Sequence, residues 1–150
     1  MTFLEKLAAL KIEMPNAPNP VANYINVKQI GSQIIVSGQI STKNGVLIAG
    51  QMGDVTTIES GYEAAKSATL NIFAQLQKAG INLDKIECVR LGVFVASTPN
   101  FFDHPKIANG ASDFMIEMLG EKGKHARVAV GVAALPLGAL IEVESIFNLL

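Results

Sequence analysis

The sequence predicts an α+β protein in which helices cover one face of a mixed β-sheet of about six strands. Apolar residues recur at helical spacing in two long segments, which predict two main helices, and in a short segment at the N-terminus. They alternate, or run continuously, in six shorter segments bounded by turn residues. A chain of 150 residues without a linker or repeat fits a single domain over residues 1–150.

The chain begins with a helix signal and then a segment that excludes regular structure. Thr2 and Glu5 form a capping-box pattern, and the apolar spacing after them predicts a short helix over residues 3–10. Residues 15–20 contain three prolines, which can neither continue a helix nor join the ladder of a central strand. This stretch is therefore expected to be an extended surface loop.

Three strands are expected next. Residues 24–30 and 33–37 read as strands, and Gly31-Ser32 between them suits a two-residue hairpin turn. A short strand over residues 46–49 follows a polar turn at residues 42–45.

The first long helix is expected to begin at a second capping-box pattern, formed by Thr56 and Glu59. It ends at Gly80, which supplies the left-handed conformation after the last turn. Residues 86–95 then form a nearly continuous apolar run. Such a run is typical of a strand that is buried on both faces or lies at the centre of a sheet.

The second long helix is expected to start at Asp103 or His104, because Pro105 suits a first helical turn, and to end at Gly120. Two strands close the chain, over residues 127–132 and 140–147.

The composition indicates that part of the apolar surface is covered by a partner. Hydrophobic residues make up 49% of the chain and charged residues only 17%, against about 25% in an average soluble domain. The side chains expected on the uncovered face of the sheet are small or apolar. Another copy of the chain is the simplest cover. A compact monomer with an apolar surface is the alternative.

The charge pattern argues against nucleic acid and anionic membranes as partners. The net charge is −1, the lysines are scattered, and the aromatic residues are not interleaved with basic ones. Cys88, the single cysteine, lies in an apolar run and is expected to be a buried thiol in a reducing compartment. Because no leader pattern or apolar run of about 20 residues is present, a cytoplasmic location is expected.

One of the two arginines is a candidate ligand-binding residue. Arg127 opens an apolar strand, and with a period of two it shares a face with Ala129 and Gly131. These small residues leave room beside a guanidinium group, whose planar fork matches a carboxylate. A structural salt bridge or a solvated charge is the alternative.

Other polar residues are weaker candidates for a functional site. Glu142 and Glu144 lie on the strand face opposite Ile141, so they are expected to pair with Arg127, to orient a water molecule, or to form an ordinary solvated face. His104 and His125 are isolated from each other and from the cysteine. No metal-ligand spacing is present, so no metal site is expected.

Several short motifs together resemble the RidA/YjgF family. They are Ile35-Val36-Ser37-Gly38-Gln39-Ile40, then His125-Ala126-Arg127-Val128-Ala129-Val130, Ala134-Leu135-Pro136 and Ile141-Glu142-Val143-Glu144-Ser145-Ile146. The similarity covers about residues 20–147. It implies the chorismate-mutase-like fold and a homotrimer with clefts between subunits. It also implies a deaminase that hydrolyses reactive 2-enamine and 2-imine acids to 2-oxo acids and ammonia, without a metal or organic cofactor.

The resemblance also assigns roles to residues of this chain. Arg127 falls on the family's carboxylate-binding arginine, Glu142 on its water-associated glutamate, and Tyr24 near its pocket tyrosine. The other residues that it implies at the substrate are Ser37, Gly38, Asn109 and Ala129.

The sequence departs from the family pattern at two places in the pocket, and an extra N-terminal helix over residues 3–10 and the loop over residues 120–124 mark a divergent branch. Ala129 stands where a cysteine is frequent, and Ala22-Asn23 replaces the usual Gly-Pro before the tyrosine. The sequence therefore leaves two hypotheses: a deaminase, or a non-catalytic protein that binds small carboxylates. Chorismate mutase is disfavoured because its substrate calls for several cations in one pocket, and an endoribonuclease is disfavoured by the charge pattern.

Overall fold

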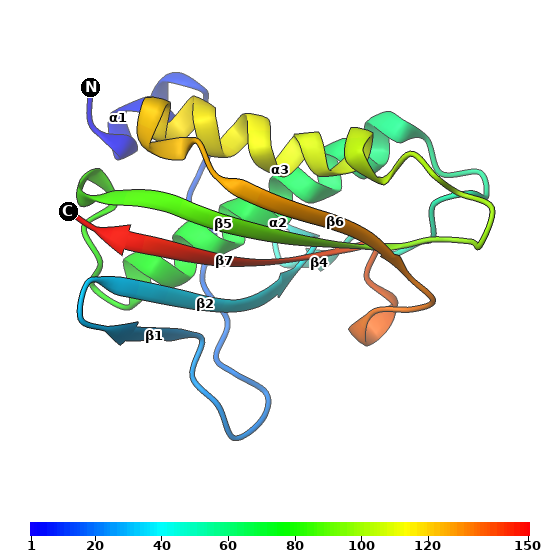
Figure 1. Cartoon of the computed structure of the whole chain (residues 1–150), viewed down its shortest axis with the longest axis horizontal. Helices are drawn as coiled ribbons and strands as arrows, with labels where there is room; N and C mark the ends of the chain where they lie inside the picture. The colour runs from blue at the N-terminus through cyan, green and yellow to red at the C-terminus, as the bar shows by residue number, and fades with distance from the viewer.

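The computed structural model describes residues 1–150 and contains one five-stranded mixed sheet in the order β1-β2-β7-β5-β6 (Figure 1). Its neighbouring strands are antiparallel, except that β5 and β6 run parallel. The strands are β1 (Val27–Ile30), β2 (Gln33–Ile40), β5 (Ile86–Ala96), β6 (Ala126–Val132) and β7 (Ile141–Leu149).

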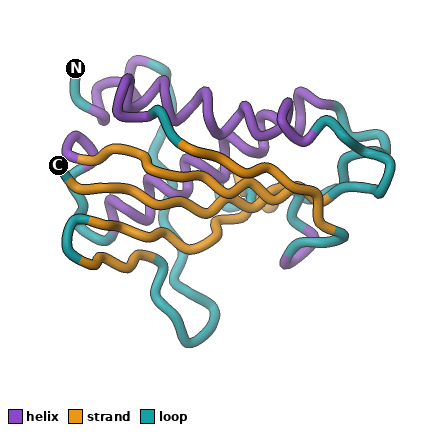
Figure 2. Tube along the Cα trace, viewed as in Figure 1, coloured by secondary structure: helices purple, strands orange, loops and turns teal.

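Two long helices, α2 (Ile58–Lys78) and α3 (His104–Leu119), pack on one face of this sheet, as predicted. Figure 2 shows α2 crossing behind the strands, while α3 runs along the edge formed by β6. The short α1 (Phe3–Ala9) contacts α3, where Lys6 Nζ donates to the carbonyl of Met118 at 3.0 Å. Three 3₁₀ turns complete the chain: η1 (Leu83–Lys85), η2 (Gly120–Gly123) and η3 (Pro136–Gly138).

The core lies between the helices and the sheet. Alternate residues of β5, among them Leu91 and Val93, are fully buried against α2 and α3. Phe73 of α2 lies at its centre, with its ring centroid 6.1 Å from that of Phe114 and 6.4 Å from that of Phe147. The apolar run predicted over residues 86–95 is therefore an interior strand.

The two expected capping boxes have different outcomes. Thr2 accepts from the backbone of Glu5 and Glu5 reaches back to Thr2, so the first prediction is confirmed. The second is wrong by one residue, because Thr57 is the N-cap of α2 and accepts from Ser60. The backbone N–H of Thr56 donates instead to Asp54 Oδ1 at 2.7 Å, in the turn that precedes the helix.

Two strand predictions need correction. The expected strand 46–49 is only β4 (Val46–Leu47), which pairs with β3 (Thr42–Lys43) in a separate hairpin closed by the positive-φ residues Asn44 and Gly45. The first strand begins at Val27 and not at residue 24. Its expected start is a bend, in which Tyr24 N donates to the carbonyl of Ala22 at 2.9 Å.

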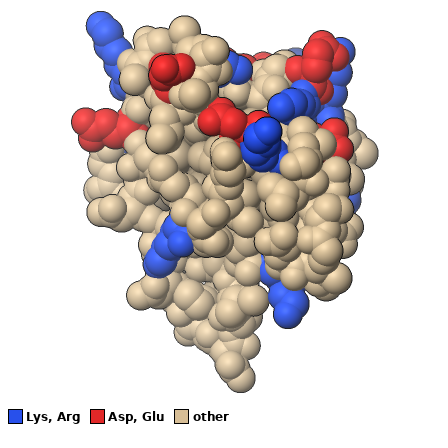
Figure 3. Space-filling model, turned by 90° about the vertical axis from the view of Figure 1, so that its left-hand side faces the viewer, with Lys and Arg blue, Asp and Glu red and all other residues tan.

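The second face of the sheet has no cover from the chain, and its side chains are largely apolar. Ile35, Val128 and Val130 are each 38% exposed there. Residues 14–26 carry no charged side chain. This segment first passes α2, where Lys78 Nζ donates to the carbonyl of Ala17 at 3.1 Å, and then projects beyond β1 as a loop (Figure 2). The tip of the molecule at this end is likewise free of charge in Figure 3, whereas charges of both signs gather on the helical part. No helix has the length and apolar character that crossing a membrane requires.

Candidate carboxylate-binding site

Arg127 lies near the start of β6, the edge strand next to α3. It pairs in register with the fully buried Leu91, so its side chain leaves the sheet on the helix-covered face. Its Nη1 atom donates to Asn109 Oδ1 at 3.0 Å and to Ser112 Oγ at 3.1 Å. Both hydrogens of Nη1 are thus used, while Nε and Nη2 have no partner in the chain. That edge of the guanidinium is the side-on fork that binds a carboxylate through two parallel hydrogen bonds.

No acidic side chain neutralises Arg127. The three ion pairs of the chain are Arg90–Glu144, Lys106–Asp103 and Lys124–Glu121. The partners of Arg127 are both neutral and the residue is exposed, so its full positive charge remains available to an anion.

The predicted residues Asn109 and Ala129 lie close to Arg127. Asn109 on α3 accepts directly from the guanidinium, and Ala129 is the next residue of β6 on the same face. Ser112, which sequence reasoning missed, stands three residues after Asn109 and hence on the same side of α3. That spacing was the available sequence signal for it.

A second group of predicted residues gathers around Glu142 on β7. Glu142 is half-buried on the uncovered face of the sheet, and a Cβ atom on Gly38 of β2 would collide with its carboxylate. Glycine is therefore needed at position 38 for this packing. Burial, and then the negative charge of Glu144, raise the pKa of the Glu142 carboxyl above its ordinary value of 4.5.

Ser37 and Tyr24 belong to this second group by position. Ser37 Oγ donates to Asn26 Oδ1 at 3.0 Å, which fastens β2 to the loop before β1. Tyr24 lies two residues before Asn26 in that loop. Tyr24 is 46% exposed, and its side chain has no hydrogen-bond partner within the chain.

The chain does not bring the two groups together. β5 lies between β6 and β7, which places Arg127 and Glu142 two strand spacings, or about 10 Å, apart across the sheet. Their side chains also leave opposite faces, because Arg127 pairs with Leu91 while Glu142 faces away from the core. Within one protomer they cannot contact the same small molecule.

The alternative in which Glu142 or Glu144 pairs with Arg127 of the same chain is excluded for the same reason. Glu144 forms its ion pair with Arg90 on the adjacent β5, where Nη1 and Oε1 are 2.9 Å apart. Both residues lie on the uncovered face, on the other side of the sheet from Arg127.

The two histidines do not contact each other or Cys88, and each lies beside a serine. His104 is the first residue of α3, and its Nε2 lies 3.1 Å from Ser97 Oγ. His125 Nε2 lies 2.9 Å from Ser112 Oγ, which is also a partner of Arg127. No group of three or more histidine, cysteine, aspartate and glutamate residues is arranged to hold a metal ion.

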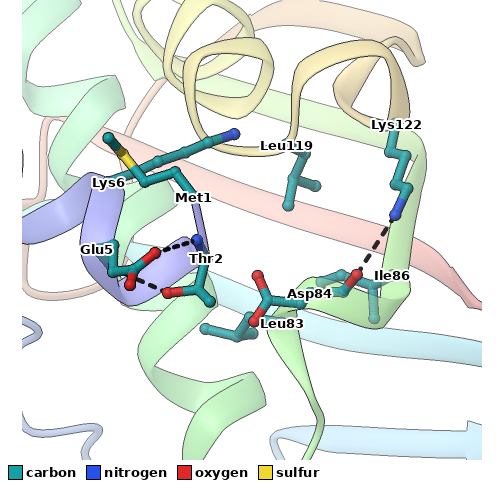
Figure 4. A pocket seen from close by; sticks show the side chains of 9 residues that line it. All are labelled: Met1, Thr2, Glu5, Lys6, Leu83, Asp84, Ile86, Leu119 and Lys122. Atoms are coloured by element: carbon teal, nitrogen blue, oxygen red, sulfur yellow. Dashed lines mark hydrogen bonds between the residues drawn. The ribbon is translucent and has the colours of Figure 1, made fainter.

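Two surface hollows lie elsewhere. One, of about 440 Å³, is lined by α1, η1 and the end of α3 (Figure 4), and its polar groups mainly bond within the chain, as in the Thr2–Glu5 box and between Lys122 and Asp84. The other, of about 1070 Å³, lies between the residue 11–18 segment, the β3–β4 hairpin and α2. Neither of these two hollows includes Arg127 or Glu142.

The fold and the arginine site define a class of small α+β protein with a chorismate-mutase-like sheet. Residues 5–149 match the family model described as "YjgF/chorismate_mutase-like, putative endoribonuclease". The chain belongs to the RidA/YjgF family.

Three relatives illustrate the range of the family. Protein TCP17 of Trypanosoma cruzi is 41% identical over 146 residues, which cover 95% of this chain and 91% of TCP17. A solved structure from Shewanella oneidensis MR-1, described as "a putative endoribonuclease", is 34% identical with a TM-score of 0.94, covering 99% of this chain and 100% of that one. A 2-iminobutanoate/2-iminopropanoate deaminase of Dermatophagoides farinae is 29% identical, covering 90% of this chain and 92% of the relative.

Proposed function

We propose that this protein is a hydrolytic deaminase of reactive 2-enamine and 2-imine acids, which it converts to 2-oxo acids and ammonia. One observation supports this proposal above the others. The guanidinium of Arg127 is held by two neutral side chains and presents its unused Nε–Nη2 edge. A small carboxylate is the ligand that this edge fits best. The deaminase from Dermatophagoides farinae gives the substrate class within the same family.

The chemistry divides between the two groups of residues. Arg127 binds the substrate carboxylate, and Asn109 keeps the guanidinium in place. Water adds to C2 of the imine, and the resulting carbinolamine loses ammonia to leave the 2-oxo acid. Glu142, as a carboxylate, takes a proton from the water and passes it to the imine nitrogen, and then relays the hydroxyl proton of the carbinolamine to the same nitrogen, which leaves as ammonia. Its raised pKa makes the carboxylate a stronger base for these transfers. Tyr24, Ser37, Gly38 and Ala129 line the site.

The site is completed by a second protomer. Since Arg127 and Glu142 cannot meet within one chain, Arg127 of one copy faces Glu142 of its neighbour. The contact then joins two different surfaces, and contacts of that kind close into rings when repeated. A homotrimer is the assembly that we propose. The apolar face around Ile35 and Val130 and the uncharged residue 14–26 loop provide surface to be buried in it.

Activity is tested with an imine acid generated in the assay, because such compounds hydrolyse spontaneously in water and cannot be stored. Release of the 2-oxo acid should accelerate on addition of the protein. Arg127→Ala should reduce kcat/KM by about 100-fold, the scale expected when a reactant loses its positioning. Lys124→Ala, an exposed cation three residues away, is the matched control and should retain full activity. Equal rates with and without the wild-type protein would refute the proposal.

Mixing two inactive variants tests the shared site. Arg127→Ala retains Glu142, and Glu142→Ala retains Arg127, so oligomers re-formed from both contain some intact sites. Random mixing should restore about one quarter of the wild-type activity if each site spans two protomers. No recovery in verified mixed oligomers would mean that both residues act from the same chain.

The second candidate function is binding of a 2-oxo acid without turnover. The replacement of the frequent cysteine by Ala129, close to Arg127, favours it. Calorimetry would then show saturable binding of 2-oxobutanoate that Arg127→Ala abolishes, with no acceleration of imine hydrolysis.

A further inference from the structure

Ser112 links Arg127 to a histidine that the proposed chemistry does not use. Arg127 Nη1 donates to Ser112 Oγ at 3.1 Å, and Ser112 Oγ lies 2.9 Å from His125 Nε2. The other ring nitrogen, His125 Nδ1, lies 2.6 Å from the carbonyl oxygen of Gly123. The chain of contacts therefore joins β6, α3 and the η2 turn.

With a neutral imidazole, the donors and acceptors along this series of contacts are satisfied in one consistent way. A carbonyl oxygen only accepts, so Nδ1 of His125 carries the hydrogen that bonds to Gly123. The neutral imidazole then offers Nε2 as an acceptor. Arg127 only donates, so the Ser112 hydroxyl oxygen accepts from it and gives its own hydrogen to Nε2. Every group in the series has a complementary partner.

Gly123, the last residue in this series of contacts, is held in place by packing. Gly123 is buried, and a Cβ atom placed there would come within 3.0 Å of the backbone at Met115 and Ile116 in α3. The η2 turn thus packs directly on the helix that also carries Ser112. The imidazole of His125 contacts Ser112, which lies on α3, and Gly123, which packs on α3. It therefore has little freedom to move away from Ser112.

We propose that His125 is a positioning residue, which orients the carboxylate-binding edge of Arg127 through Ser112. This inference rests on the proposed function for its ligand. His125 fixes the direction of the Ser112 hydroxyl, whose lone pair then faces Nη1. Together with Asn109, this uses both Nη1 hydrogens and leaves the Nε–Nη2 edge free for a carboxylate.

A merely structural role for His125, fastening the turn before β6, predicts different results. It would lower the free energy of unfolding on substitution, without coupling to Ser112 in ligand binding. A double-mutant cycle separates the two roles, since residues that act through one contact do not contribute additively.

The binding test uses 2-oxobutanoate and calorimetry on the assembled protein. Ser112→Ala and His125→Ala should each weaken binding about fivefold, as expected for one hydrogen bond. The double variant should be no weaker than Ser112→Ala alone. His125→Gln, which keeps an acceptor for the Ser112 hydroxyl, should recover most of the affinity, and Lys124→Ala should equal the wild type. Additive losses, or an unchanged affinity in His125→Ala, would overturn the inference.

A second readout does not depend on the proposed function. The side-chain Nε–H signal of Arg127 in a ¹⁵N-resolved NMR spectrum reports how firmly the guanidinium is held. It should be sharp in the wild type and in Lys124→Ala, and broadened or shifted in Ser112→Ala and His125→Ala. If the wild type binds no 2-oxo acid but this pattern is seen, the proposed function fails while the positioning role stands. An unaltered Arg127 signal in His125→Ala overturns the positioning role whatever the ligand.

Discussion

Arg90 and Glu144 form an ion pair on the uncovered face of the sheet, with Nη1 and Oε1 2.9 Å apart. Glu142 lies two residues before Glu144 on the same face, and the charge of Glu144 contributes to the raised pKa of the Glu142 carboxyl. The cation of Arg90 partly offsets that charge. The ion pair therefore influences the protonation of the residue proposed to handle the protons of the reaction.

Replacing Arg90 should consequently move the pKa of Glu142. In Arg90→Met, Glu144 has no compensating cation, so the pKa of Glu142 should rise further. Glu144→Gln removes the repelling charge and should lower it. The measurement is the pH dependence of kcat/KM, whose Glu142 limb should shift to higher pH in the first variant and to lower pH in the second. Shifts in the same direction for both would exclude this electrostatic relationship.

Glu142 should also affect stability in a pH-dependent manner. Its folded-state pKa is raised above the unfolded value, so the folded state holds the proton more tightly. Its favourable contribution is complete below the unfolded pKa and is lost as the pH rises through the folded pKa. Glu142→Gln, which cannot ionise, should therefore increase the free energy of unfolding at pH 7 relative to the wild type, with a smaller difference at pH 4. Urea unfolding at one fixed protein concentration measures both differences.

Replacing Gly110 with alanine should destabilise the protein, although this substitution ordinarily stabilises a helix. Alanine is better than glycine in a helix by about 1 kcal/mol. At position 110, however, the new Cβ would collide with the backbone carbonyl of Tyr62, where α3 crosses α2. We expect Gly110→Ala to destabilise the protein by about 1–3 kcal/mol, because the helices must separate.

Gly61 provides the matched comparison. It is also a buried helix glycine, but the atoms nearest to an added Cβ are the ends of the Ile107 and Met52 side chains. Those side chains can rotate, so Gly61→Ala should cost less than Gly110→Ala in thermal denaturation. Equal losses of stability in the two variants would show that the close approach of the Tyr62 backbone is not what requires glycine at position 110.

The sequence predicted the elements whose determinants are local. The Thr2–Glu5 box, the turn at Gly31 and the apolar run from Ile86 all depend on neighbouring residues, and the structure contains each of them. The start of α2 was misplaced because Thr56 and Thr57 both suit an N-cap. In the structure the backbone N–H of Thr56 donates to the Asp54 carboxylate, so Thr56 belongs to the preceding turn and Thr57 is the N-cap.

The candidate site was predicted only in part, because local sequence patterns determine some of its features and long-range pairing determines the others. The alternation along the final strands correctly placed Glu142 away from the core and Arg127 beside Ala129. Strand order and the face on which each side chain leaves the sheet arise from long-range pairing, which a local pattern does not contain. The separation of Arg127 from Glu142 and the contact of His125 with Ser112 therefore emerged only in the folded chain.

Gly38 offers the most direct test of how Glu142 is placed. The new Cβ of Gly38→Ala would occupy the position of the Glu142 carboxylate, which must turn away because the colliding atoms belong to a movable side chain. Folding should be nearly unaffected, whereas kcat should fall by about tenfold or more, since proton transfer depends on the placement of the acid or base. The KM for the imine acid should change little, because the new Cβ displaces the Glu142 carboxylate and does not touch Arg127, which binds the substrate carboxylate. Adding Glu142→Gln to Gly38→Ala should cause no additional loss if the glycine acts solely by giving the carboxylate room. A full additional loss of activity in that double variant would mean that position 38 contributes to the reaction independently of Glu142.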